Sequence, residues 1–175
     1  MVAGGGAPRY TETMRKPTGS HVVNCDIDTF WEIFRDEKFT EQLHSQDLGS
    51  RSLEVLELTD TVRRLRVSPK LDMPKAVAKL LGDSFAYEEQ AELDRATNTW
   101  RWKIIPSTLA DKVTTEGHFR LEPVDGGKCR RIDQATIEAK VFGLGKVLES
   151  TTEKQVLATW DTEVAGVNRW AAKRG

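Results

Sequence analysis

A single long segment with the spacing of a helix ends the chain, and segments with the spacing of strands precede it. Between Lys146 and Lys173, the apolar residues Val156, Trp160, Val164 and Val167 follow one another at intervals of four, four and three residues. This spacing predicts one amphipathic helix, and at ~1.5 Å per residue about 26 residues reach roughly 39 Å. A helix of that length crosses the whole width of a small sheet, so the fold has to be built around it.

The rest of the chain is predicted to form two short helices and about seven strands. After a first strand at residues 21–25, Asp26 or Asp28 is a candidate N-cap for a helix that carries Phe30, Trp31, Ile33 and Phe34. A second short helix is expected at residues 38–46. Alternating apolar residues then predict six more strands, around Leu53 and Val55, from Val62 to Val67, and at residues 84–93, 99–105, 112–122 and 130–141.

Length and charge limit the classes of protein to which this chain can belong. The 175 residues carry 26 Lys and Arg against 27 Asp and Glu, a formal net charge of −1, so we expect no nucleic-acid partner. No apolar run approaches the ~18 residues that a membrane-spanning helix needs. Residues 1–19 contain a glycine run and few aliphatic side chains, which predicts a flexible tail before one domain at residues 20–173.

Cysteine and histidine are too few and too scattered for a redox or metal motif. Cys25 and Cys129 form no CxxC pair, which favours two small buried thiols in a reducing compartment, and hence a cytoplasmic protein, over a disulfide. His21, His44 and His118 lack the spacing of metal ligands, so we expect no metal and no cofactor. A GxSxG nucleophile motif is also missing, and we assign no catalytic residue.

The predicted order of elements implies a pocket. A curved antiparallel sheet needs one face covered, and only the C-terminal segment is long enough to cover it. A curved sheet and a straight cylinder do not match in shape along their whole length, so a space remains between them unless large side chains fill it. We expect its mouth near residues 68–82, an insert with Pro69 and Pro74 and one or two helical turns.

Three local sequences carry a resemblance to a known superfamily. They are Asp28-Thr29-Phe30-Trp31-Glu32-Ile33-Phe34, Met73-Pro74-Lys75-Ala76-Val77-Ala78-Lys79-Leu80-Leu81-Gly82, and Phe142-Gly143-Leu144-Gly145-Lys146-Val147-Leu148-Glu149. With the element order, they resemble the START-like superfamily, also called SRPBCC or Bet v 1-like and polyketide cyclase-like, and within it the family of unknown function DUF2505. The resemblance implies an α+β helix-grip fold and the binding of a lipid or other apolar small molecule. A minority of the superfamily acts as cyclases or hydrolases.

Aromatic and aliphatic residues on the expected inner surfaces are the candidate ligand contacts. Trp100 and Trp102 share a strand face, and the helix contributes residues at helical spacing. If that face is concave, the pocket is lined by Tyr87, Trp100, Trp102, Phe119, Ile137, Val156, Leu157 and Trp160. The alternative is that these side chains fill the space completely and form an ordinary core.

Three functions remain open at this point, and the leading one is a monomeric, non-catalytic carrier of an apolar ligand. The second is an enzyme of the cyclase or aromatase type, with Glu89, Tyr87 or Glu138 as acid or base. The third is a regulatory partner in which ligand binding moves the insert. The segment from Met73 to Gly82 carries Lys75 and Lys79 beside apolar residues, which also predicts transient contact with a membrane surface.

Charged residues on the strands are predicted to face solvent. Arg63, Arg64 and Arg66 form one cluster, and Arg130 and Arg131 another. They could face an anionic head group, but pairing with strand glutamates on an outer face is the favoured interpretation. His118, between Glu116 and Arg120, is likewise assigned to an outer polar row opposite Val113, Thr115, Phe119 and Leu121.

Overall fold

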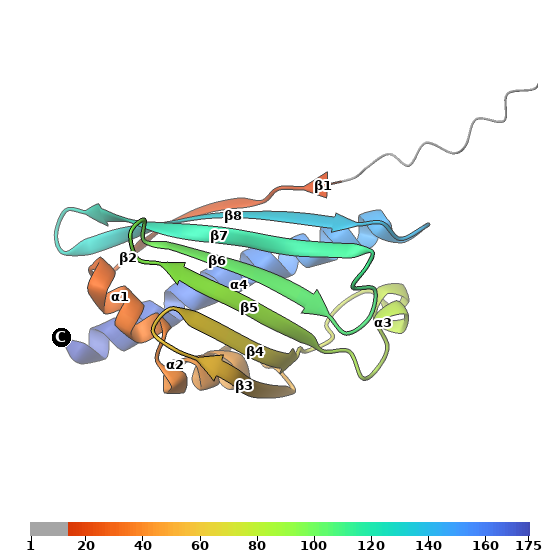
Figure 1. Cartoon of the computed structure of the whole chain (residues 1–175), viewed down its shortest axis with the longest axis horizontal. Helices are drawn as coiled ribbons and strands as arrows, with labels where there is room; N and C mark the ends of the chain where they lie inside the picture. Colours follow the sequence, from red (N-terminus) through yellow and green to blue (C-terminus); the bar gives the residue numbers. More distant parts are fainter. Residues whose placement is uncertain (1–13) are drawn as a thin grey trace, which may run out of the picture.

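The computed structural model describes residues 14–175, in which an antiparallel sheet curves around one long helix (Figure 1). In chain order the elements are β1 (Met14–Arg15), β2 (Thr18–Val23), α1 (Ile27–Phe34), α2 (Glu37–Gln42), the π-helical turn η1 (Leu43–Asp47), β3 (Ser52–Leu58), β4 (Val62–Ser68), α3 (Lys75–Leu81), β5 (Tyr87–Asp94), β6 (Thr99–Pro106), β7 (Val113–Val124), β8 (Lys128–Ala139) and α4 (Gly145–Arg174). The strands follow the order β1-β8-β7-β6-β5-β4-β3, and β2 also pairs with β8. The predicted α+β helix-grip class is confirmed, with eight strands instead of seven.

The N-terminal edge of the sheet begins earlier than the sequence predicts. β2 starts at Thr18 rather than at residue 21, and Met14 and Arg15 pair with Glu138 and Ile137 of β8. Met14, Arg15, Thr18 and Gly19 therefore belong to the sheet, although the sequence predicts a tail there; residues 1–13 of that tail lie outside the described residues. The long strand β8 offers an edge to these residues, and this pairing leaves no mark in their local hydrophobic pattern.

Acidic N-caps set the start of both early helices. The Asp26 side chain accepts a hydrogen bond from the Thr29 amide at 2.8 Å, and the Asp36 side chain accepts one from the Phe39 amide at 3.0 Å. Each carboxylate satisfies an amide that has no partner within its helix. The predicted second helix at residues 38–46 is divided into α2 and the wider π-helical turn η1, which carries His44.

One end of the space between sheet and helices is filled by aromatic rings. Phe30, Trp31 and Phe34 of α1 pack against Trp100 and Phe119 of the sheet, with ring centroids 5.2 to 6.5 Å apart. The rings alternate between stacked and edge-on contacts, the geometries that aromatic pairs prefer. This cluster closes the sheet beneath α1, so any open space lies further toward α3.

The helix α4 crosses the sheet from the α3 end to the α1 end (Figure 1). As predicted, Trp160, Val164 and Val167 are buried. The same face also buries Glu149 and Glu163. The predicted apolar stripe is thus interrupted by carboxyl groups, which a core accepts only when they have partners. None of the helices in residues 14–175 is long and apolar enough to cross a membrane.

The turn between β8 and α4, Gly143-Leu144-Gly145, depends on its glycines. Gly143 has φ +76°, and a Cβ at Gly145 would lie 2.5 Å from the Ala139 carbonyl oxygen. Both conditions exclude an ordinary side chain. The insert forms the helix α3, whose residues Val77 and Leu81 pack with Ala139 and Leu148 into a second, smaller core cluster.

Candidate ligand-binding site

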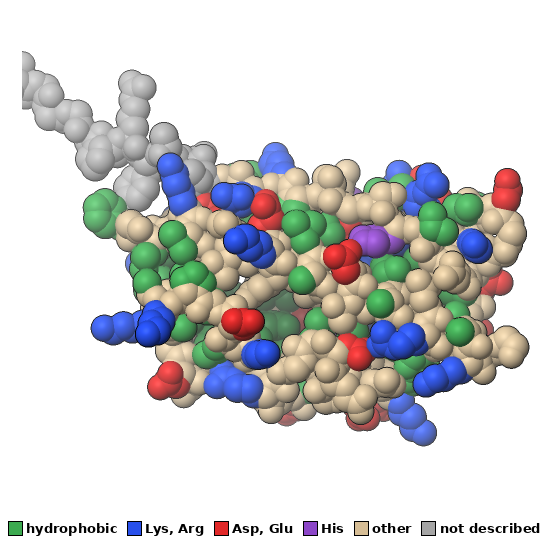
Figure 2. All heavy atoms as spheres, turned by 180° about the vertical axis from the view of Figure 1, so that it is seen from behind, with side chains coloured by type: hydrophobic (Ala, Val, Ile, Leu, Met, Phe, Trp, Pro, Cys, Tyr) green, Lys and Arg blue, Asp and Glu red, His purple; other side chains and the backbone are tan. Residues whose placement is uncertain are grey.

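A cavity of about 520 Å³ lies between the inner face of the sheet and α4. Figure 2 views the side of the molecule opposite to Figure 1, and the surface there is hollowed, with hydrophobic side chains visible inside. Strands β6 and β7 and the segment between β4 and β5 supply most of its apolar wall: Pro69, Met73, Val77, Leu81, Phe85, Trp100, Trp102, Ile104, Pro106, Val113 and Phe119. The side of α4 that faces it contributes Leu148, Val156 and Trp160 between polar threonines.

The two ends of the cavity differ in chemistry. Near α3, the cavity is bordered by the apolar cluster of Val77, Leu81 and Leu148. Next to the aromatic cluster, polar and ionisable side chains line it instead: His44, Arg63, Glu89, Arg131 and Glu163. Leu148 and Glu163 stand fifteen positions apart on α4, which corresponds to roughly 22 Å along a helix. The cavity is therefore long, with an apolar end and a polar end.

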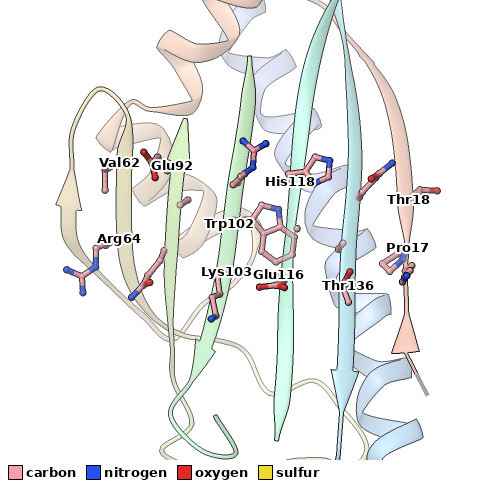
Figure 3. Close-up of a pocket in the computed structure, with 17 residues that line it drawn as sticks. Pro17, Thr18, Val62, Arg64, Glu92, Trp102, Lys103, Glu116, His118 and Thr136 are labelled. Atoms are coloured by element: carbon pink, nitrogen blue, oxygen red, sulfur yellow. The ribbon is translucent and has the colours of Figure 1, made fainter. Parts of the chain in front are cut away.

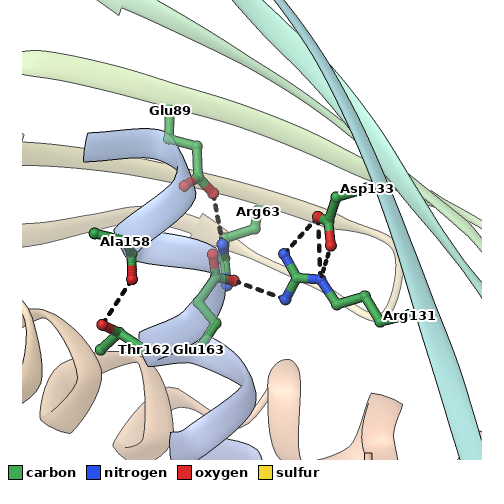
Figure 4. Close-up of polar contacts among 7 residues, drawn as sticks. All are labelled: Arg63, Glu89, Arg131, Asp133, Ala158, Thr162 and Glu163. Atoms are coloured by element: carbon green, nitrogen blue, oxygen red, sulfur yellow. Dashed lines mark hydrogen bonds and ion pairs between the residues drawn. The ribbon is translucent and has the colours of Figure 1, made fainter. Parts of the chain in front are cut away.

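Arg131 is held by two carboxylates at the polar end (Figure 4). Its side chain is 1% exposed, its Nε and Nη2 donate to both oxygens of Asp133 at 2.9 to 3.1 Å, and its Nη1 donates to Glu163 at 3.4 Å. The guanidinium also lies 3.9 Å from the centre of the Phe119 ring. Burial raises the pKa of Glu163, against the opposing influence of Arg131. This network joins β8 to α4 across the interior.

Arg63 forms a second buried ion pair, with Glu89 (Figure 4). Its Nε and Nη2 lie 2.9 and 2.7 Å from one oxygen of Glu89, and its guanidinium carbon lies 4.9 and 5.0 Å from the ring centres of Phe34 and Trp100. Ion pair and rings together hold the guanidinium in one orientation. Neighbouring strands β4 and β5 thus present a fixed cation and anion to the cavity.

His44 and Tyr87 complete the polar end. His44 is only 4% exposed, and burial lowers its pKa to about 4, with Glu89 opposing this shift and Arg63 adding to it. Its imidazole is therefore neutral at physiological pH. Burial, together with the charge of Glu89, raises the pKa of the Tyr87 hydroxyl well above its usual range, so this hydroxyl keeps its proton.

Six of the eight predicted ligand contacts surround this cavity: Tyr87, Trp100, Trp102, Phe119, Val156 and Trp160. The other two predicted residues lie elsewhere. Ile137 is fully buried but does not reach the cavity wall, and Leu157 is 37% exposed on the side of α4 that faces away. Leu157 follows Val156 directly, and a helix turns by about 100° between neighbours, so both cannot face the same space.

Among the three predicted acids and bases, Tyr87 and Glu89 face the cavity. Glu138 does not: it stands on the opposite side of β8, 3.3 Å from Lys140. The strand alternation explains this result, because the inner positions of β8 are the odd-numbered ones that include Arg131, Asp133 and Ile137.

The prediction that all clustered arginines face solvent is wrong for two of them. Arg64 and Arg66 pair with Glu88 and Glu54 on the outer face, as predicted. Arg63 and Arg131 point inward instead and are almost fully buried. The alternation of β4 already places Arg63 on the same face as the buried Leu65 and Val67. The sequence analysis nevertheless assigned it to the outer face, because arginine is rarely buried unless it is paired. His44 and Glu163 were missed because their partners lie on other elements.

The outer face of the sheet carries a second, polar hollow of about 920 Å³ (Figure 3). His118 and Glu116 line it with Lys103 and Arg64, which confirms the outer polar row predicted around His118. Trp102 borders this hollow as well as the inner cavity. Within residues 14–175, no group of three His, Cys, Asp or Glu side chains could hold a metal ion.

The family model described as "Protein of unknown function (DUF2505)" matches residues 18–171. The chain belongs to the DUF2505 family. No curated protein matches the sequence of this DUF2505 protein.

Solved structures similar to this DUF2505 protein share its fold at low identity. Norcoclaurine synthase from Thalictrum flavum superposes with a TM-score of 0.67 at 12% identity, covering 98% of this chain and 96% of that one. The Zhui aromatase/cyclase from Streptomyces sp. R1128 gives 0.66 at 15% identity, covering 90% and 95%. Ara h 8.0201 gives 0.63 at 12% identity, covering 89% and 98%. These are Bet v 1-like proteins, so the DUF2505 protein has the fold of the SRPBCC superfamily.

Proposed function

We propose that this DUF2505 protein binds and carries an elongated apolar or amphipathic small molecule, such as a lipid, between the sheet and α4. The observation that carries the proposal is the cavity of about 520 Å³, which persists although aromatic rings fill the neighbouring end of the same space. Pockets for small organic ligands commonly measure about 300–1,000 Å³ and combine apolar walls with a few polar groups. The cavity of this protein has both properties.

The arrangement of charges supports a carrier. Arg63 and Arg131 are each engaged with carboxylates, so the guanidinium groups fix the shape of the polar end.

The two cysteines are free and buried, which favours the cytoplasm as the location of the protein, because secreted domains of this size commonly carry disulfides. We expect the carrier to be a monomer.

The helix α3 is the part of the wall that we propose as the entrance. Val77 and Leu81 pack inward, whereas Lys75 and Lys79 are exposed. A transient membrane contact through the segment Met73 to Gly82 would therefore begin with the two lysines and would require α3 to turn its apolar side outward.

Two neighbouring helix positions provide a matched test. Val156 lines the cavity and Leu157 faces away, so Val156→Phe reduces the cavity while Leu157→Phe leaves it unchanged. With the uncharged fluorescent probe N-phenyl-1-naphthylamine, wild type and Leu157→Phe are expected to bind equally, and Val156→Phe at least several-fold more weakly. Native mass spectrometry is expected to detect a bound lipid after gentle purification. Equal probe binding by all three proteins, together with no co-purified ligand, would refute the proposal.

A second candidate function is an enzyme of the cyclase type, and it is favoured by the position of Tyr87 and Glu89 on the cavity wall. Two proteins of similar fold are described as an aromatase/cyclase and a synthase. If Tyr87 takes part in a reaction, the compound that co-purifies with Tyr87→Phe will differ in mass from the one that co-purifies with wild type. Identical compounds would support the carrier.

A further inference from the structure

Two buried nitrogen atoms at the polar end of the cavity have no hydrogen-bond partner within residues 14–175. They are Nη1 of Arg63 and Nδ1 of His44. Arg63 is 3% exposed and His44 is 4% exposed, and both side chains line the cavity. Buried polar groups in native proteins are nearly always paired, so each exception calls for an explanation.

The geometry leaves Arg63 with one donor to spare. Its Nε and Nη2 are occupied by Glu89, and the rings of Phe34 and Trp100 fix the plane of the guanidinium (Figure 4). A guanidinium carries N–H donors and no acceptor. The remaining Nη1 therefore keeps hydrogens that can be donated to an oxygen in the adjoining cavity, whose wall Arg63 lines.

We propose that this polar end is a subsite for an uncharged carbonyl oxygen, which accepts a hydrogen bond from Arg63 Nη1 beside His44. The ligand class is then an elongated apolar molecule that carries a ketone, aldehyde, ester or amide group at one end. This inference rests on the proposed ligand-binding function and adds to it the chemistry and the orientation of the ligand.

The charges around the subsite favour a neutral oxygen over a carboxylate. The two guanidinium groups of Arg63 and Arg131 are balanced by the carboxylates of Glu89 and Asp133. Glu163 adds a third carboxyl group, whose burial raises its pKa. An anionic head group would therefore place an additional negative charge in a buried region that holds no excess positive charge, and this is unfavourable.

The shape of the cavity sets the orientation of the ligand. Arg63 and Glu163 mark the polar end, and Leu148 and Val77 mark the apolar end near α3. A ligand with one oxygen-bearing end therefore lies with its carbonyl deep beside Arg63 and its apolar body directed toward α3, since the charged guanidinium donor that is held in place lies at the polar end.

Three probes of nearly identical shape test the subsite on the unmodified protein. They are 2-acetylnaphthalene, its oxygen-free isostere 2-isopropenylnaphthalene, and the carboxylate 2-naphthoate. We expect the ketone to bind at least about tenfold more tightly than the isostere. This corresponds to at least about 1.4 kcal/mol, close to the lower end of the range for a hydrogen bond that involves a charged group. We expect 2-naphthoate to bind more weakly than the ketone.

A variant and a spectrum identify the donor. Arg63→Met alone would leave Glu89 buried and unpaired, so the variant is Arg63→Met combined with Glu89→Met, which removes both partners. It is expected to abolish the preference for the ketone while it retains the affinity for the isostere. In the unmodified protein, the infrared C=O stretch of carbonyl-labelled 2-acetylnaphthalene is expected to shift to lower frequency than in an alkane, and this measurement does not depend on the folding of the variant.

The outcomes separate this inference from the proposed function. If ketone and isostere bind equally and the C=O stretch matches that in alkane, the carbonyl subsite is refuted while the cavity still binds apolar ligands. If 2-naphthoate binds most tightly, the subsite takes an anion and the charge argument is wrong. If none of the probes binds and Val156→Phe changes nothing, the proposed function itself fails.

Discussion

Protonation of His44 offers a quantitative test of how the polar end is built. The side chain is almost completely buried beside the Arg63–Glu89 pair, and burial lowers its pKa to about 4, against the ordinary value of 6.5. At 1.36 kcal/mol per pKa unit, the difference corresponds to about 3 kcal/mol of stability.

The sign of the effect follows from proton binding in the two states. Above pH 6.5, His44 is neutral in both the folded and the unfolded chain, so it adds no pH dependence to the free energy of unfolding. Between pH 6.5 and about 4, His44 binds a proton in the unfolded chain but stays neutral in the folded chain. The free energy of unfolding therefore falls as the pH decreases. Glu163 acts in the opposite direction, because its raised pKa favours protonation of the folded state.

A comparison of variants isolates the histidine from the carboxyl group. Urea denaturation, followed by tryptophan fluorescence at several pH values, is applied to wild type, His44→Gln and His118→Gln. The difference in unfolding free energy between wild type and His44→Gln is expected to change by about 3 kcal/mol between pH 7 and pH 4. His118 lies on the outer face and is partly exposed, so His118→Gln should show at most a small change. A difference that stays constant for His44→Gln would show that its imidazole is not held neutral by burial.

Three further predictions concern packing and buried charge. Arg131→Met leaves two buried carboxyl groups without their partner and is expected to lower the unfolding free energy by about 3–5 kcal/mol. The control Arg130→Met, on the outer face, should lower it by under ~1 kcal/mol. Equal losses for the two variants in urea denaturation would contradict this prediction. Gly117→Ala places a Cβ 2.4 Å from the Gln134 carbonyl oxygen and is expected to cost roughly 1–3 kcal/mol, so an unchanged thermal midpoint would argue against the strand register. Cys129 is fully buried, and with Ellman's reagent its thiol is expected to react only as fast as the protein opens; immediate reaction in the native state would disprove its burial.

Local patterns were sufficient for most of the fold. Apolar residues alternate along β4 to β8, and Trp160, Val164 and Val167 recur at helical spacing on the last helix. Such repeats predict a strand or a helix from the segment alone, whatever it packs against. The edge strand β1 was missed because two residues that pair with β8 carry no periodic signal. Pairing with a distant edge is decided by the partner strand.

The sequence predicted a cavity because a curved sheet and a straight helix do not match in shape. It did not predict the charged groups at one end of that cavity. The alternation that buries Leu65 also buries Arg63, yet a buried arginine is stable only when a carboxylate lies beside it. Glu89 and Glu163 lie 26 and 100 residues from Arg63 in the chain, and a sequence pattern that spans one element cannot bring them together.

The sequence by itself determined the helix-grip class, the order of its main elements and the apolar face of the strands, since these depend on residues a few positions apart. Only the tertiary structure decided which end of the space between sheet and helix is filled and which stays open. Phe30, Trp31 and Phe34 of α1 reach Trp100 and Phe119 across the sheet, whereas the buried cluster beside α3 consists of the aliphatic side chains Val77, Leu81, Ala139 and Leu148. Close packing depends on the volumes of side chains that meet from distant segments, and the same long-range contacts place the one spare donor of Arg63 in the cavity.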